Sequence, residues 1–263
     1  MTKLEFETLV FEIDGVETVV KVIGEGDPVI FLHGASTLEG FDFVAGLADR
    51  FRVYCPSHPG MGYSGDAPHV ADMSDMLIHY LNLLDSLALG KMPHLIGFSM
   101  GGWMATHLAS IARERFSRAV LMAPAGLGDP AHPPTDLGAI APQDFPAFLA
   151  HNVEVALRYF PDGSDAGEAE RFGAARAREN DVVGRLCAAH GMKHPNLRHF
   201  LRRIDNPALV VWGTQDRLLP ASQAPLWVDA LPHARLLLVE DAGHLIAQEK
   251  PESLKAIGDF LAA

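Results

Sequence analysis

The chain of 263 residues is poor in several features that define whole classes of protein. It holds two cysteines, Cys55 and Cys187, without CxxC spacing, so we expect two unpaired thiols rather than a disulfide framework. It has no uninterrupted run of about 18 apolar residues, the length that a membrane-spanning helix requires. Its 24 glycines and 18 prolines are near average usage, which excludes collagen-like and low-complexity chains.

Basic residues are also scarce relative to acidic ones. The 21 Lys and Arg against 33 Asp and Glu give a net charge of −12, which disfavours nucleic acid and anionic membranes as partners. The first 15 residues lack an apolar core and a small-residue cleavage site, so no secretory signal is expected and a cytoplasmic location is predicted. With 48% hydrophobic residues, the chain can instead build a large core.

Short apolar runs alternate with helix-like stretches along most of the chain. Such runs are typical of strands buried on both faces of a parallel sheet. They lie at 29–32, 52–55, 94–98, 119–122, 208–212 and 235–240, with helical patterns at 74–87, 100–112, 221–230 and 251–261. Alternating apolar residues from Leu4 to Val22, around Asp14-Gly15, indicate an antiparallel hairpin. The pattern predicts an α/β fold with helices on both faces of the sheet.

One long stretch interrupts this alternation. From 126 to 203 no buried strand is expected, and a Pro/Gly-rich opening leads into helical patterns around 145–159, 166–190 and 196–203. We therefore expect a core made of residues 1–125 and 204–263. Residues 126–203 would form a helical cap inserted after the sixth strand of the sheet.

The most informative string is Gly97-Phe98-Ser99-Met100-Gly101, a GxSxG pattern between an apolar strand and an apolar helix. That context is the one in which this motif marks a nucleophilic serine. Small neighbours allow the strand to turn at once into a helix, which lifts the Ser99 hydroxyl above the carboxyl edge of the sheet. The helix N-terminus beneath it favours developing negative charge.

A serine nucleophile needs a base and an acid that orients the base. Asp216 follows the strand at 208–212, and His244 follows the strand at 235–240. The order Ser, Asp, His is one in which such triads occur, and both residues come from strand ends at the edge that carries Ser99. The connection after the sixth strand reads Ala-Pro-Ala at 123–125 and offers no competing carboxylate. The predicted catalytic residues are therefore Ser99, Asp216 and His244.

Acyl transfer also requires donors for an oxyanion. The expected donors are the backbone N–H of Met100 and that of Ala35, which follows the turn His33-Gly34, with Ser36 as the alternative to Ala35. Further substrate-binding residues are expected next to the nucleophile, in the same loop and on the apolar face of the cap: Phe98, Ser36, Phe145 and Phe148. No metal site is expected, because His190 and His194 are separated by helix-breaking Gly191 and lack a third ligand.

Several motifs together resemble the α/β-hydrolase superfamily, over the whole chain except the cap. They are HG at 33–34, HPGMGYSG at 58–65, GFSMGG at 97–102, GTQD at 213–216 and GH at 243–244. The resemblance implies an eight-stranded, mostly parallel sheet flanked by helices, with a lid after the sixth strand. The elbow and the start of the cap look like those of meta-cleavage-product hydrolases, which cleave carbon–carbon bonds. Leu245 departs from their pattern, since an aromatic residue commonly follows their catalytic histidine. Arg185 is the candidate for their cap arginine.

These observations predict a serine hydrolase that cleaves an ester or related acyl bond of a small, fairly hydrophobic substrate, without a cofactor. Three alternatives stay open at this point. One is carbon–carbon bond hydrolysis of a dienoate ketone. The second is perhydrolase or acyl-transfer chemistry with the same triad, and the third is a ligand-binding protein without catalysis. The expected partner is a small molecule, not nucleic acid or membrane, and a homodimer through the cap or the edge strand is left open.

Overall fold

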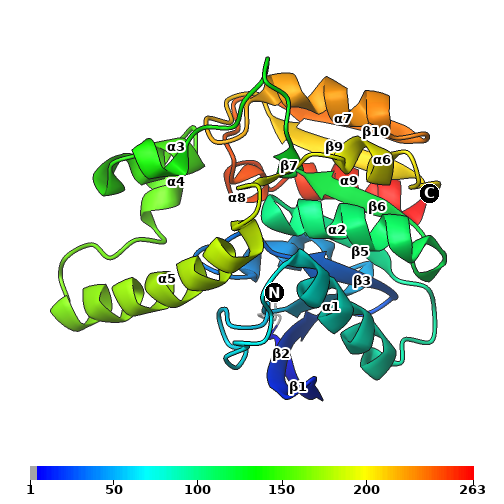
Figure 1. Ribbon diagram of the computed structural model, residues 1–263, viewed down its shortest axis with the longest axis horizontal. Coiled ribbons are helices and arrows are strands. Elements are labelled where there is room, and N and C mark those ends of the chain that lie inside the picture. Colours follow the sequence, from blue (N-terminus) through cyan, green and yellow to red (C-terminus); the bar gives the residue numbers. More distant parts are fainter. Residues whose placement is uncertain (1–4) are drawn as a thin grey trace.

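The computed structural model describes residues 5–263, so Leu4 of the expected hairpin lies outside the described residues. An eight-stranded sheet runs through the molecule in the order β1-β2-β4-β3-β5-β6-β9-β10 (Figure 1). Its strands are β1 Glu7–Ile13, β2 Val16–Ile23, β3 Asp27–Leu32, β4 Phe51–Pro56, β5 His94–Phe98, β6 Ala119–Met122, β9 Ala208–Gly213 and β10 Ala234–Val239.

The first two strands form the expected antiparallel hairpin. Asp14 and Gly15 connect them with φ angles of 51° and 79°, the left-handed pair that a tight two-residue turn requires. Strand β2 pairs antiparallel with β4, and every later pairing in the sheet is parallel. The mostly parallel sheet expected from the apolar runs is thus confirmed, and its central strands are buried on both faces. The expectation was wrong for the run at 235–240, because β10 lies at the edge of the sheet and leaves Leu236 and Leu238 exposed.

Helices cover both faces of this sheet. They are α1 Met73–Leu87, α2 Met100–Ile111, α7 Ala224–Ala230, α8 Ile246–Glu249 and α9 Ser253–Ala262, with 3-10 turns η1 Asp42–Leu47, η2 Arg113–Arg115 and η5 Ala221–Gln223. Helices α1, α2 and α7 lie on one face, while η1 packs against α9 on the other (Figure 1). The parallel strands consequently end together at one edge, where the connecting loops gather.

The segment between β6 and β9 contributes no strand to this sheet within the described residues. It comprises β7 Gly126–Leu127, η3 Leu137–Ala139, η4 Pro142–Asp144, α3 Phe145–Leu149, α4 Val153–Leu157, α5 Ala166–Cys187, β8 Lys193–His194 and α6 Leu197–Leu201. The short parallel pair of β7 and β8 was not expected from the sequence. In Figure 1, α5 extends away from the sheet, and α3 and α4 lie above it in this view. That residues 126–203 form a separate cap domain stays a prediction.

The helix expected over 145–159 is broken into α3 and α4, and tertiary contacts explain the break. Ala150 is extended, with ψ 145°, which frees the carbonyl of Leu149 to accept the backbone N–H of Leu245 over 2.9 Å. A Cβ on Gly243 would lie 2.6 Å from the backbone nitrogen of His151, so the two backbones touch. The inserted segment is therefore anchored on the loop that carries His244.

Among the helices of residues 5–263, none combines the length and the apolar character needed to cross a bilayer.

Candidate active site

Ser99 stands at the junction of β5 and α2 in a conformation that few residues other than glycine adopt. Its φ is 54° and its ψ −117°, and its side chain is largely buried. A Cβ on Gly97 would lie 2.4 Å from the Gly101 carbonyl oxygen, and one on Gly101 would lie 2.2 Å from that of Leu32. The small residues of the motif are thus required by close backbone contacts, as the sequence analysis expected.

His244 and Asp216 lie together at the same edge of the sheet. His244 Nδ1 donates to Asp216 Oδ2 over 2.7 Å, and both side chains are almost fully buried. The other carboxylate oxygen, Oδ1, accepts the backbone N–H groups of Leu218 and Leu219, each over 2.9 Å. Three donors hold the carboxylate, which fixes the imidazole tautomer and leaves Nε2 as the nitrogen free to act as a base.

The loops that carry these two side chains are pressed against each other. A Cβ on Gly213, at the end of β9, would lie 2.3 Å from the carbonyl oxygens of both Ala242 and Gly243. The ring of Phe98 approaches the ring of His244, with 4.8 Å between their centroids. Phe98 therefore contacts the expected base as well as preceding the expected nucleophile.

The loop after β3 approaches Ser99 closely. A Cβ on Gly34 would lie 3.3 Å from Cβ of Ser99, and Ala35 and Ser36 line the same cavity as Ser99. Met100 begins α2 directly after Ser99, and its side chain is buried in the core. The backbone amides of Ala35 and Met100, the expected oxyanion donors, thus belong to segments on either side of Ser99.

Two stacked histidines brace this loop. Their ring centroids are 3.6 Å apart, and His33 Nε2 accepts the backbone N–H of His58 over 3.0 Å. His33 Nδ1 must then carry the proton that it donates to the Gly34 carbonyl over 2.9 Å. Burial lowers the pKa of His33 to about 4, so its ring is neutral near pH 7 and serves the loop rather than proton transfer.

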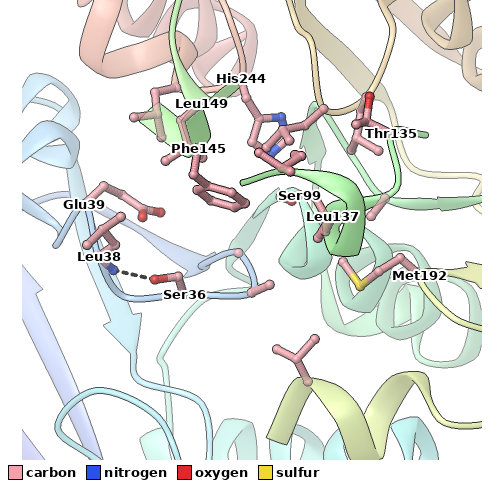
Figure 2. Close-up of a pocket in the computed structure, with 18 of the residues that line it drawn as sticks. Ser36, Leu38, Glu39, Ser99, Thr135, Leu137, Phe145, Leu149, Met192 and His244 are labelled. Carbon is pink, nitrogen blue, oxygen red and sulfur yellow. Dashed lines mark hydrogen bonds between the residues drawn. The ribbon is translucent and has the colours of Figure 1, made fainter. Parts of the chain in front are cut away.

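A cavity of about 540 Å³ lies above Ser99 and His244, which face it from the sheet side (Figure 2). Most of its wall is apolar and comes from the inserted segment and the loop after β9. Of the expected substrate-binding residues, Phe98, Ser36 and Phe145 line it. The expectation was wrong for Phe148, which is not among the described residues that line the cavity. Its ring packs instead against the guanidinium of Arg217, whose Cζ lies 4.2 Å from the ring centroid.

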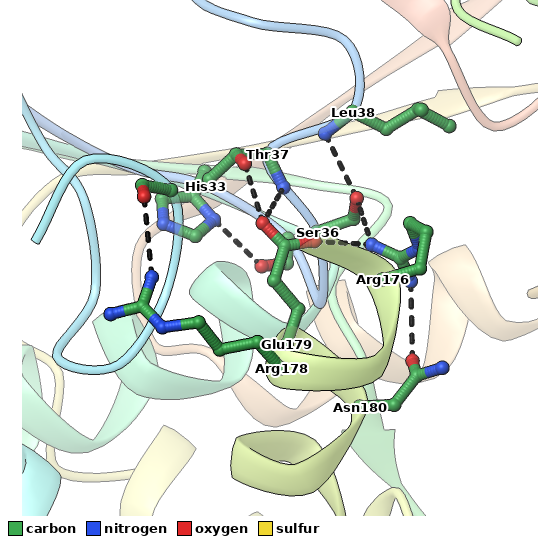
Figure 3. A network of polar contacts seen from close by, with 10 residues as sticks. His33, Ser36, Thr37, Leu38, Arg176, Arg178, Glu179 and Asn180 are labelled. Carbon is green, nitrogen blue, oxygen red and sulfur yellow. Dashed lines mark hydrogen bonds and ion pairs between the residues drawn. The ribbon is translucent and has the colours of Figure 1, made fainter. Parts of the chain in front are cut away.

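Helix α5 closes one side of the cavity with a polar network (Figure 3). The side chain of Glu179, 4% exposed, pairs with Arg176 and accepts the backbone N–H and the hydroxyl of Thr37. Arg176 also donates to the Ser36 hydroxyl and to Oδ1 of Asn180. The helix is thereby tied to the loop that carries the expected oxyanion donor.

Two more arginines of α5 bind the loop that contains the glycine-rich motif at 58–65. Arg178 pairs with Asp66 over 2.7 Å and donates to the Ser64 carbonyl over 2.6 Å. Arg185 donates to the carbonyls of Ala67 and Val70. Arg185 thus turns away from the cavity, and Arg176 is the arginine that lines it, contrary to the expectation from the resemblance.

Sequence reasoning missed two charged residues of the cavity, Glu39 and Arg176. Glu39 belongs to the loop after β3 and is 8% exposed. Nothing in the local pattern marks it, because an acid in a loop is ordinarily solvated. Arg176 carries a weak signal, the acid Glu179 three residues later on the same helix face. In the described part of the chain, no three His, Cys, Asp or Glu side chains are grouped to hold a metal ion.

Known proteins resemble this chain over most of its length. Residues 29–256 match the alpha/beta hydrolase family. The chain is 31% identical, over 87% of its length, to the "dihydrolipoyllysine-residue acetyltransferase component of acetoin cleaving system" of Pseudomonas putida, and spans about three fifths of that relative (61%). It is 29% identical to the "2-hydroxy-6-oxononadienedioate/2-hydroxy-6-oxononatrienedioate hydrolase" of Paraburkholderia phymatum, over 94% of this chain and 88% of the relative.

A solved structure shows the same fold. The crystal structure of a membrane phospholipase A superposes with a TM-score of 0.82, at 22% identity, over 98% of this chain and 86% of that one. The family match over residues 29–256 thus agrees with the eight-stranded, mostly parallel sheet and its flanking helices. The chain belongs to the alpha/beta hydrolase family.

Proposed function

We propose that this protein is an enzyme, a serine hydrolase that cleaves an ester or related acyl bond of a small, fairly hydrophobic substrate. One observation carries the proposal. Ser99, with a φ of 54°, shares one cavity with His244, whose Nδ1 is hydrogen-bonded to the buried carboxylate of Asp216. A serine, a histidine and a carboxylate that orients the histidine are the parts of a catalytic triad. The mostly apolar wall of the cavity suits an apolar acyl or alcohol group.

In this mechanism Ser99 Oγ attacks the substrate carbonyl carbon while its proton passes to His244 Nε2. Asp216 keeps Nδ1 protonated and stabilises the imidazolium that forms. The amides of Met100 and Ala35 donate to the oxyanion of the tetrahedral intermediate, each donor being worth roughly 3–4 kcal/mol. The proton then passes to the leaving alcohol, and water hydrolyses the acyl-enzyme by the same route in reverse.

The test is turnover of p-nitrophenyl esters from acetate to octanoate by the intact enzyme. Ser99→Ala should lower kcat by at least about 10³ while leaving the circular dichroism spectrum unchanged. Ser86→Ala, in an exposed position of α1, is the matched control and should retain full activity. Equal ester turnover by Ser99→Ala would contradict the proposal.

A second candidate is carbon–carbon bond hydrolysis of a dienoate ketone. It is supported by the printed name of the 29%-identical relative. Faster decay of a ring-cleavage product than of every ester would favour it. It uses the same triad, so that result would keep Ser99 as nucleophile and change the substrate class.

A further inference from the structure

Glu39 differs from the other buried acids near the active site because, within residues 5–263, no side chain donates a hydrogen bond to its carboxyl. It lines the cavity together with Ser99 and His244 and is 8% exposed (Figure 2). Apart from its own backbone amide, no donor or cation within residues 5–263 binds this carboxyl. By contrast, Asp216 and Glu179 each receive several hydrogen bonds from the protein.

The nearby cation in the cavity wall is already engaged elsewhere. Arg176 pairs with Glu179 and donates to Ser36 and Asn180 (Figure 3). Its charge is thus balanced by a carboxylate that is more deeply buried than the arginine itself. Because Arg176 and Glu179 neutralise each other, Glu39 is the one acid without a paired cation among the described residues that line the cavity.

The carboxyl oxygens open onto the cavity rather than being sealed inside the protein, so a ligand that displaces cavity water can supply a hydrogen bond in its place. Burial raises the pKa of Glu39 to about 7, against the opposing influences of its own amide, His244 and Arg176. A substrate O–H or N–H group that reached this carboxyl would therefore gain a strong acceptor. A substrate carboxylate would be repelled by the ionised Glu39, and Arg176 would not compensate because it is already paired with Glu179.

We propose that Glu39 is a specificity-determining residue, which accepts a hydrogen bond from an O–H or N–H group of the substrate and disfavours anionic substrates. This inference rests on the proposed function and narrows it. The preferred substrate is an ester that carries a hydroxyl or amine group away from the scissile bond. An anionic dienoate is a poor match for the same cavity.

Two matched substrate panels at pH 8, where Glu39 is mostly ionised, test the proposal. The first panel holds the p-nitrophenyl esters of hexanoic, 6-hydroxyhexanoic and 6-aminohexanoic acids, and the mono-p-nitrophenyl ester of adipic acid. The second panel carries the same terminal groups on the alcohol part of the ester. It holds the acetates of hexyl, 6-hydroxyhexyl, 6-aminohexyl and 5-carboxypentyl alcohols, and hydrolysis is measured by the release of acid. Within at least one panel, kcat/KM should be tenfold or more higher for a donor-bearing ester than for the plain ester, and lowest for the carboxylate.

Two variants separate the hydrogen bond from the charge. Glu39→Leu should abolish the preference for donors and remove the penalty on the carboxylate. Glu39→Gln, which keeps an acceptor oxygen, should retain part of the donor preference and lose the penalty. Asp42→Asn removes an exposed acid three residues further along and should leave both rankings unchanged.

The outcomes distinguish this inference from the proposed function. If the wild-type enzyme turns over none of the esters, the proposed function fails. If it turns over plain hexanoate or hexyl acetate but ranks donor-bearing esters no higher in either panel, the role of Glu39 is refuted. The same holds if the ranking persists in Glu39→Leu. The wild-type ranking alone decides if a variant does not fold.

Discussion

The unusual environment of Glu39 predicts a measurable dependence of stability on pH. Burial raises the pKa of this carboxyl from 4.5 to about 7 in the folded chain. Ionising it is therefore about 3 kcal/mol less favourable in the folded chain than in the unfolded chain. Between these two pH values the folded state holds the proton more often than the unfolded state does. The contribution of Glu39 to stability is thus intact below pH 4.5 and is lost as the pH rises through 7.

The variant Glu39→Gln isolates this effect, because glutamine resembles the protonated acid at every pH. Relative to wild type, the free energy of unfolding of the variant should rise by about 3 kcal/mol between pH 4.5 and pH 8. The other charged groups that act on Glu39 are His244, Glu179 and Arg176, and these are present in both proteins.

Urea unfolding at pH 4.5, 6, 7 and 8, followed by tryptophan fluorescence, gives the required free energies. Asp42→Asn is again the control, since its exposed acid should produce a much smaller dependence on pH. A difference between wild type and Glu39→Gln that does not change with pH would refute the reasoning. A difference that shrinks as the pH rises would refute it as well.

Two further predictions concern the triad and the elbow. Asp216→Asn should lower kcat by about 10⁴ in the ester assay, because an amide cannot hold His244 in the same tautomer; a loss below tenfold would contradict that role. Gly101→Ala should lower the free energy of unfolding by about 3 kcal/mol or more, since its Cβ would lie 2.2 Å from the Leu32 carbonyl oxygen. Gly173→Ala, at an open position of α5, should instead raise it by up to about 1 kcal/mol in the same unfolding experiment.

The strands could be predicted because a short apolar run in the local sequence indicates a buried strand. The run at 208–212 is apolar at every position and is buried throughout in β9. The placement of Asp216 and His244 at one edge follows from the same reasoning, since parallel strands end together. What the sequence could predict of the site is therefore what depends on strand order and on short motifs.

The remaining features depend on contacts between distant segments. The break between α3 and α4 arises where Leu149 meets Leu245, a contact that no periodicity in 145–159 reveals. Phe145 and Phe148 lie three residues apart on one short helix, but Arg217 holds the second ring away from the cavity. The burial of Glu39 has no local sign, because an acid in a loop is ordinarily solvated; only the fold brings it to the cavity that Ser99 and His244 also line.

The central claim is that Ser99 is an activated nucleophile, and covalent labelling tests it most directly. The intact enzyme is incubated with a fluorophosphonate, and its mass and labelled peptide are determined. The account predicts one adduct per chain, located on Ser99, with Ser99→Ala unlabelled and Asp216→Asn labelled far more slowly. No adduct under conditions that label a known serine hydrolase, or an adduct on a residue other than Ser99, would contradict it.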